Sequence, residues 1–151
     1  MTRRKSINPV RHRRIYNELS ELNSGIDFIF EKNNNIQRDS IHQVTMEKDG
    51  DTYEFKLLIT YPFTPPILYI NNVEYIEQLH KYWLSFKSFY NIKSICICES
   101  TILCSNRWSP GFKIIDILNE IENTKIRIKS IYKRSYVERV MNRYNIFENG
   151  I

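Results

Sequence analysis

Three prolines stand within five residues of the run TYPFTPP, at positions 62, 65 and 66. Proline fixes its own φ angle and has no backbone N–H, so this run cannot form a helix or lie inside a sheet. The apolar residues that follow it, 67–70, predict a short strand. The sequence therefore predicts a stiff loop at the border of a sheet, and the other elements have to be arranged around that loop.

The residues before this loop predict a β-hairpin. Two strand-like runs within residues 40–60 flank Lys48-Asp49-Gly50-Asp51, which has the composition of a tight turn. Alternate residues of a strand point to opposite faces of a sheet. We expect one face of the second run to carry Tyr53, Phe55, Leu57 and Ile59. The polar residues 31–40, ahead of the first run, predict a loop.

Helical periodicity appears on both sides of the predicted sheet. Residues 9–25 predict an amphipathic helix with an Arg-rich outer face, a stop at Gly25 and apolar positions at Val10, Ile15, Leu19 and Leu22. Residues 73–90 fit a helix better than a strand, with apolar positions at Val73, Ile76, Leu79, Trp83 and Phe86 or Tyr90. Ser109-Pro110 is expected to open a helix with the stripe Ile114, Ile117, Leu118 and Ile121. A last helix is expected to carry Ile128, Ile131, Tyr132, Tyr136, Val140 and Tyr144.

The order of these elements predicts one α+β domain, with an N-terminal helix, an antiparallel meander sheet and C-terminal helices packed on one face. A chain of 151 residues is most simply a single domain, and we expect residues 1–9 to be a flexible basic tail. No apolar run approaches the roughly 18 residues that span a bilayer, and the N-terminal residues lack the apolar stretch of a secretory signal. We therefore expect a monomer with no membrane partner, in the cytoplasm or the nucleus.

All three cysteines, Cys96, Cys98 and Cys104, fall close together. An odd, clustered set argues against a secreted disulfide scaffold and favours a reducing compartment. Free cysteines are usually small buried hydrophobic residues, and that interpretation stays open. Three thiolates with His80 or His42 could also bind zinc, but the second cysteine pair of the usual spacing is missing, so we assign no metal site. The third interpretation is one reactive thiol with two neighbours.

Several fragments, taken in order, resemble the ubiquitin-conjugating enzymes. The run from Arg14 to Leu22 is similar to the first helix of that family. The loop of the family is matched by Tyr61-Pro62-Phe63-Thr64-Pro65-Pro66. The active-site run of the family is matched by Asn91, Ile97-Cys98, Ile102-Leu103 and Trp108-Ser109-Pro110. The resemblance spans most of the chain, and the Pro-rich loop and the Cys-to-Trp-Ser-Pro run are its most specific parts.

The resemblance implies a UBC-like fold and a transferase that carries ubiquitin, or a ubiquitin-like modifier, as a cysteine thioester and passes it to a lysine. It implies Cys98 as the thioester residue, with Cys96 as the alternative, and Asn91 as the donor to the oxyanion. A thiolate is nucleophilic without a histidine base, and no His or Asp lies at an obvious triad position here. No cofactor is expected.

The resemblance also implies a surface where the activating enzyme and the ubiquitin ligase dock. We expect it to contain Phe63, Ser109, Pro110, Arg13 and Arg14. The chain departs from the family pattern at Phe89-Tyr90, where the family has His-Pro, and in a longer gap between Cys98 and Trp108. These departures leave an alternative, in which the chain is a catalytically inactive relative that binds ubiquitin or serves as a scaffold.

Six basic residues crowd the first fourteen positions, namely Arg3, Arg4, Lys5, Arg11, Arg13 and Arg14. Such a stretch can hold nucleic acid or an acidic protein, or it can be the solvated start of a helix. No RNA- or DNA-binding signature accompanies it elsewhere in the chain, so we expect no nucleic-acid partner. A basic nucleic-acid-binding module remains a third hypothesis for the function.

Overall fold

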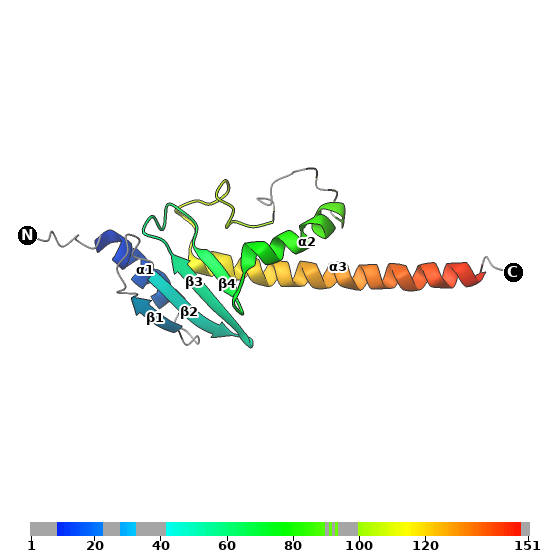
Figure 1. The fold of residues 1–151 in the computed structure, drawn as a ribbon, viewed down its shortest axis with the longest axis horizontal. Coiled ribbons are helices and arrows are strands. Elements are labelled where there is room, and N and C mark those ends of the chain that lie inside the picture. Colours follow the sequence, from blue (N-terminus) through cyan, green and yellow to red (C-terminus); the bar gives the residue numbers. More distant parts are fainter. Residues whose placement is uncertain are drawn as a thin grey trace, which may run out of the picture.

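The computed structural model describes residues 9–22, 28–32, 42–89, 91, 93 and 100–148. The elements are α1 (Pro9–Leu22), β1 (Phe28–Lys32), β2 (His42–Lys48), β3 (Asp51–Leu57), β4 (Ile67–Ile70), β5 (Val73–Glu74), α2 (Tyr75–Phe89) and α3 (Ile114–Glu148). The strands form one antiparallel sheet in chain order from β1 to β5 (Figure 1). The predicted α+β class, N-terminal helix and meander sheet are confirmed.

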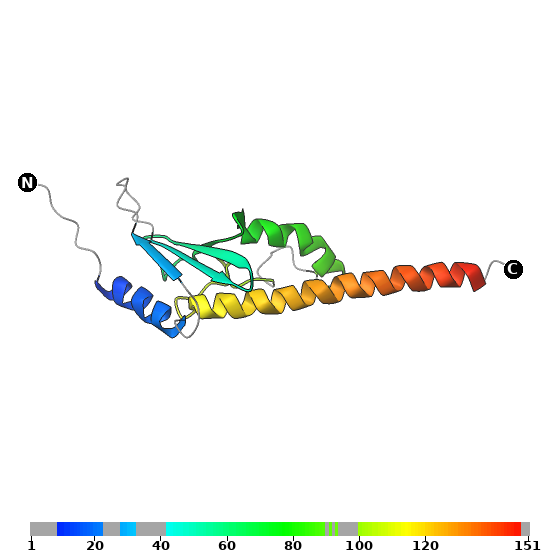
Figure 2. The ribbon, with the colours of Figure 1, turned by 90° about the horizontal axis from the view of Figure 1, so that it is seen from below.

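One face of the sheet is buried. Two rows of buried side chains cross the strands β2, β3 and β4 in register, Val44, Phe55 and Leu68 in one row and Met46, Tyr53 and Ile70 in the other. The opposite face carries partly exposed side chains, among them the ion pair of Glu54 and Lys56. Helices α1 and α3 lie on the buried side (Figure 2). The predicted alternation along β3 is thus confirmed from Tyr53 to Leu57.

The two tight turns of the sheet have the backbone geometry that their residues favour. Asp49 and Gly50 join β2 to β3 with φ angles of 55° and 83°, as the turn composition predicts. Asn71 and Asn72 join β4 to β5 with φ angles of 50° and 66°. The Asn71 side chain also donates to Asp51 Oδ1 at 2.8 Å and accepts from the backbone N of Thr52 at 2.9 Å. The second turn is therefore tied to the end of the first hairpin.

Two predictions about the sheet are wrong. Strand β1 includes Glu31 and Lys32, which pair with Gln43 and His42, although their polarity predicted a loop. Ile59 is 51% exposed instead of lying on the buried face, because β3 ends at Leu57 and the chain turns there into the Pro-rich loop.

Helix α2 confirms the helix predicted for residues 73–90, with one change at its start. Val73 belongs to β5 and is 39% exposed, so it is not part of the apolar stripe. Leu79 and Trp83 are buried and Ile76 is half-buried, as their spacing predicted. The side chains of Phe86 and Tyr90 lie outside the described residues.

Helix α3 differs from the prediction at its start and in its length. It begins at Ile114 and not at Ser109-Pro110, because Asp116 Oδ2 accepts from the backbone N of Lys113 at 2.8 Å and so caps the first turn. It continues without a break to Glu148, whereas two helices were predicted. No Gly or Pro interrupts residues 114–148. The stripe Ile114, Ile117, Leu118 and Ile121 is buried as expected.

The predicted stop of α1 at Gly25 and the predicted tail up to residue 8 lie outside the described residues; Pro9 already belongs to α1. None of the described helices is both long and apolar enough to span a membrane.

Candidate functional site

The Pro-rich loop and the Trp-Ser-Pro segment are bound to each other. Trp108 Nε1 donates a hydrogen bond of 2.8 Å to the carbonyl oxygen of Pro62, across 46 residues of sequence. The ring of Trp108 lies 6.2 Å from the ring of Tyr61 and 5.8 Å from that of Phe112. Aromatic rings at such distances attract one another in addition to burying apolar surface. The two segments therefore form one structural unit.

A buried carboxylate joins this unit to both helices of the buried face. Glu18 is 2% exposed and its Oε2 accepts from the hydroxyl of Tyr61 at 2.7 Å and from the backbone N of Ile114 at 3.0 Å. Its Oε1 accepts from Arg14 Nε, and Arg14 Nη2 donates to the carbonyl oxygen of Phe112 at 2.9 Å. We call Glu18, Arg14, Tyr61 and the N–H of Ile114 the Glu18 junction.

The Glu18 junction is stable because each buried polar group meets a partner. Removing a carboxylate from water costs several kcal/mol, which only well-placed hydrogen bonds and a cation can offset. Burial raises the pKa of the Tyr61 hydroxyl far above its usual value, and the charge of Glu18 raises it further. Burial lowers the pKa of Arg14, but the hydrogen bond and charge of Glu18 outweigh burial and raise it overall. Both donors therefore keep their protons.

The residues predicted to receive a ligase lie on the two joined segments. Phe63 is 77% exposed on the Pro-rich loop, and Ser109 and Pro110 are exposed next to Trp108. Each loop is closed by its own backbone hydrogen bond, from Phe63 N to Thr60 O at 2.8 Å and from Phe112 N to Ser109 O at 2.9 Å. The structure thus places these three side chains on adjoining loops held by a buried frame. Their contact with a ligase remains a prediction.

The arginines of α1 divide between surface and interior. Arg13 is exposed. Arg14 is engaged in the Glu18 junction, and Arg11 is 8% exposed, with Nη2 donating to the carbonyl oxygens of Leu57 at 3.0 Å and Leu58 at 2.7 Å. The predicted Arg-rich outer face of this helix is therefore wrong for Arg11 and Arg14. Both Arg13 and Arg14 were predicted at the docking surface. Arg13 is exposed there, whereas Arg14 is bound to Glu18.

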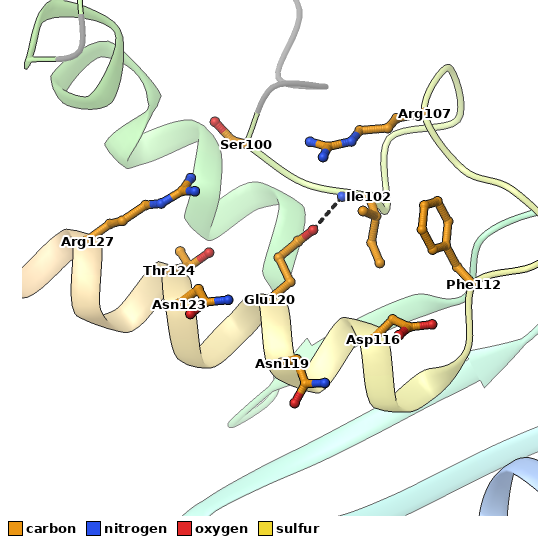
Figure 3. Close-up of a pocket in the computed structure, with 10 residues that line it drawn as sticks. All are labelled: Ser100, Ile102, Arg107, Phe112, Asp116, Asn119, Glu120, Asn123, Thr124 and Arg127. Atoms are coloured by element: carbon orange, nitrogen blue, oxygen red, sulfur yellow. Dashed lines mark hydrogen bonds between the residues drawn. The ribbon is translucent and has the colours of Figure 1, made fainter.

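A cavity of about 320 Å³ opens between the start of α3 and the loop that precedes it (Figure 3). Its walls are mostly polar, with Ser100, Ile102, Arg107 and Phe112 from the loop and Asp116, Asn119, Glu120, Asn123, Thr124 and Arg127 from α3. We call it the α3 pocket. Ser100 is the second residue after Cys98 in the sequence. The pocket is therefore lined by a residue that is close in sequence to the predicted nucleophile.

Glu120 is the central acid of the α3 pocket. Its Oε2 accepts from the backbone N of Ile102 at 2.6 Å, which holds the loop on the helix (Figure 3). Burial raises the pKa of Glu120, and it outweighs the hydrogen bonds from Thr101 and Ile102 and the charges of Arg107 and Arg127 that act against it. The pocket can accordingly present a carboxyl group that holds its proton more tightly than a solvated one.

The predicted catalytic residues are only partly placed. Asn91 is exposed and has a φ angle of 52°, a left-handed backbone conformation that Asn tolerates better than most residues. Cys98 and its alternative Cys96 lie outside the described residues. Cys104 is half-buried against the core and is disulfide-bonded. A disulfide uses two of the three cysteines of the chain, so in this form Cys104 offers no thiolate and only one cysteine is left with a free thiol.

The zinc hypothesis finds no support in the part of the chain that the structure describes. There, no group of three His, Cys, Asp or Glu side chains is arranged to hold a metal ion. His80 is exposed on α2, and the side chain of His42 lies outside the described residues.

The sequence carried a signal for the Glu18 junction that the prediction did not use. Ile15, Leu19 and Leu22 are the buried stripe of α1, and Arg11 and Glu18 occupy the same helical face. A charged residue in an apolar stripe is rare unless it is paired, so its position indicates a buried partner. The α3 pocket had no comparable signal, because its walls come from two segments that meet only in the fold.

Comparisons with protein-family models, with curated proteins and with solved structures found no match for this chain.

Proposed function

We propose that this chain is a UBC-like carrier protein, which takes ubiquitin or a ubiquitin-like modifier onto Cys98 as a thioester and transfers it to a lysine with the help of a ligase. The proposal is supported above all by the hydrogen bond from Trp108 Nε1 to the Pro62 carbonyl. That bond joins the two sequence motifs that most resemble the family, although nothing in their separate patterns requires them to meet.

The arrangement of the joined segments also suits the proposed role. A carrier must be recognised by an activating enzyme and a ligase through a surface that keeps its shape. Phe63 and Pro110 expose apolar side chains on loops that the Glu18 junction and Trp108 hold in place. A small exposed apolar patch on a rigid frame is a usual protein-binding surface.

The proposed chemistry has two acyl transfers. The thiolate of Cys98 attacks the carbonyl carbon of the modifier's C-terminal thioester on the activating enzyme, and the activating enzyme's cysteine leaves as a thiolate. A lysine amine then attacks the new thioester, an amide bond forms, the bond to Cys98 breaks and the amine loses a proton. A donor to the oxyanion, the role proposed for Asn91, lowers such a barrier by roughly 3 kcal/mol.

The proposal is tested by thioester formation. The chain is first reduced, because Cys104 is disulfide-bonded, and the reductant is removed. It is then incubated with activating enzyme, ATP and ubiquitin, and separated on a non-reducing gel. We expect an adduct that a thiol reductant removes and that Cys98→Ala does not form. Cys98→Ser should form an ester that resists the reductant, because an oxygen ester does not exchange with thiols.

The other two cysteines provide the matched controls. Cys96→Ala and Cys104→Ala should keep the adduct, and an adduct that depends on Cys96 instead would move the carrier role to that residue. If no adduct forms with ubiquitin or with any ubiquitin-like modifier and its own activating enzyme, the carrier proposal is wrong. In that case titration of isotope-labelled ubiquitin with the chain decides whether the inactive, ubiquitin-binding alternative holds.

A further inference from the structure

The second half of α3 extends away from the rest of the described structure. Tyr132 still contacts α2, with its ring 6.4 Å from the ring of Tyr82. Beyond that point α3 continues past the end of α2 with no other described element beside it (Figures 1 and 2). None of the described side chains from 133 to 143 is buried. An isolated helix of this length is marginal in water, so a covering partner would stabilise it.

One face of α3 changes composition where the helix leaves the body. Steps of three or four residues keep to one helical face. On the body this face carries Ile114, Leu118, Ile121, Lys125 and Ile128. The same steps then lead to Tyr132, Tyr136, Arg139 and Arg143, which we call the Tyr-Arg stripe. Tyr132 is 58% exposed and Tyr136 is 70% exposed, and both arginines are exposed.

The charge of the uncovered part of α3 is strongly basic. Four basic side chains stand against one acidic side chain between residues 132 and 143. The acid, Glu138, pairs with Arg134 at 3.4 Å, on the side of the helix away from the stripe. No described side chain forms an ion pair with Arg139 or Arg143. The stripe thus presents two guanidinium groups and two phenol rings without an acidic partner on the described chain.

We propose that the Tyr-Arg stripe docks on an acidic surface of another protein, whose carboxylates pair with Arg139 and Arg143 and whose apolar groups cover Tyr132 and Tyr136. Tyr and Arg are the residue types enriched in protein–protein interfaces and among the residues that dominate their binding energy. Arginine also pairs with carboxylates through two parallel hydrogen bonds, which fixes the orientation of a partner. This inference does not depend on the proposed carrier function.

Three other occupants fit the stripe less well. A second copy packed stripe against stripe would offer the arginines no carboxylate, because the stripe contains no acidic residue. A helix that lies in a membrane surface buries a strongly apolar face, whereas arginines occupy half of the stripe. Nucleic acid requires dense positive charge along a phosphate backbone. The four basic residues of this part of α3 do not form such a row, because Arg139 and Arg143 lie on the stripe whereas Lys133 and Arg134 lie off it.

The inference is tested with the full chain and a displayed library of random peptides long enough to form a helix. We expect the recovered peptides to be rich in Asp and Glu next to aliphatic or aromatic residues. Their affinity is then measured by fluorescence anisotropy at physiological salt. The double variant Arg139→Glu/Arg143→Glu and the single variant Tyr136→Ala should each weaken binding by about tenfold or more.

The matched control is Lys133→Glu/Arg134→Glu, which changes the net charge by the same amount on the same helix but off the stripe. It should alter the affinity less than about threefold. Equal losses in both double variants would show that only net charge matters, and undiminished binding of the stripe variants would show that peptides bind elsewhere. Either result overturns the inference.

Three further results would also overturn it. The first is recovered peptides without an excess of acidic residues, and the second is self-association of the chain in sedimentation that Arg139→Glu/Arg143→Glu abolishes. The third is binding through the stripe to phosphatidylserine vesicles or poly(U) RNA in place of acidic peptides. Far-UV circular dichroism of each variant establishes that α3 remains helical before affinities are compared.

Discussion

Two carboxyl groups, Glu18 of α1 and Glu120 of α3, each bind another segment of the chain, but they differ in their exposure and in their number of hydrogen-bond donors. Glu18 is closed off from solvent and meets a guanidinium, a phenol and a backbone N–H at once. Glu120 stands in the wall of an open pocket and accepts from the backbone N of Ile102. Arg107 and Arg127, the cations of that pocket, are both exposed.

This difference indicates that the Glu18 junction serves to hold the fold, whereas the α3 pocket is still able to bind a ligand or react. In the Glu18 junction each polar group has a hydrogen-bond partner. Replacing any one of them therefore leaves another buried polar group without a partner. The α3 pocket leaves room for a ligand and keeps a carboxyl group whose pKa burial has raised. Perturbed carboxyl groups in clefts are common at functional sites, whereas closed ion pairs more often serve the fold.

The largest effect is expected from Glu18→Ala. This change removes the shared acceptor of Arg14 Nε, the Tyr61 hydroxyl and the Ile114 N–H, and it leaves Arg14 with its bond to the Phe112 carbonyl. Breaking a buried pair by removing one partner costs about 3–5 kcal/mol. The free energy of unfolding, measured by chemical denaturation, should fall by that amount.

The matched control for this prediction is Glu21→Ala, one turn further along α1. Glu21 also forms an ion pair, with Lys113 Nζ at 2.8 Å, but both side chains are well exposed, at 50% and 38%. Such pairs contribute roughly 0–1 kcal/mol. If Glu18→Ala and Glu21→Ala cost the same, the Glu18 junction does not hold the fold together.

An intermediate effect is expected from Tyr61→Phe. The variant keeps the ring against Trp108 and removes the hydroxyl that donates to Glu18. A hydrogen bond to a charged group contributes about 1.5–3 kcal/mol. Tyr69→Phe, on the partly exposed face of the sheet, should change the unfolding free energy by less than about 0.5 kcal/mol. If Tyr61→Phe costs no more than Tyr69→Phe, the hydroxyl of Tyr61 does not contribute to the stability of the junction.

Much of the fold could be predicted from local patterns. The turn at Asp49-Gly50, the alternation from Tyr53 to Leu57 and the prolines of the following loop each act over a few residues, and each is where the sequence indicated. The last two residues of strand β1 could not be predicted in this way. Glu31 and Lys32 have poor strand composition, and they are extended because their backbones pair with β2. The continuity of α3 was missed although the sequence carried a signal for it, since no Gly or Pro interrupts residues 114–148.

The exposure of the residues predicted for docking could be foreseen from the sequence, whereas the buried partners around them could not. Phe63 and Pro110 lie in Pro-containing turns and are exposed there, and such turns can be recognised from residue types near in sequence. The roles of Glu18 and Glu120 depend on partners that the fold brings together, Tyr61 for the first and Ile102 for the second. A charge in an apolar stripe indicates that a partner exists, but not which residue it is.

The smallest effect, and one of opposite sign, is expected from Glu120→Gln. Glutamine still accepts from Ile102 N and avoids the burial of a charge, so at pH 7 the unfolding free energy should stay equal or rise by less than about 1 kcal/mol. Because burial raises the pKa of Glu120 in the folded protein, that form binds the proton more tightly than the unfolded chain. Wild-type stability should therefore fall, relative to the variant, as pH rises from the ordinary carboxyl value of 4.5 through the raised pKa.

Denaturation curves at several pH values measure this difference, and Glu122→Gln, a neighbouring acid of α3 outside the pocket, controls for the loss of one charge from the same helix. Asp116, Arg107 and Arg127 also line the α3 pocket and are present in both proteins. If Glu120→Gln instead loses about 3 kcal/mol at pH 7, as a broken buried pair does, then Arg107 and Arg127 hold the charged form. The pocket would then be a second closed junction, and the contrast with Glu18 would disappear.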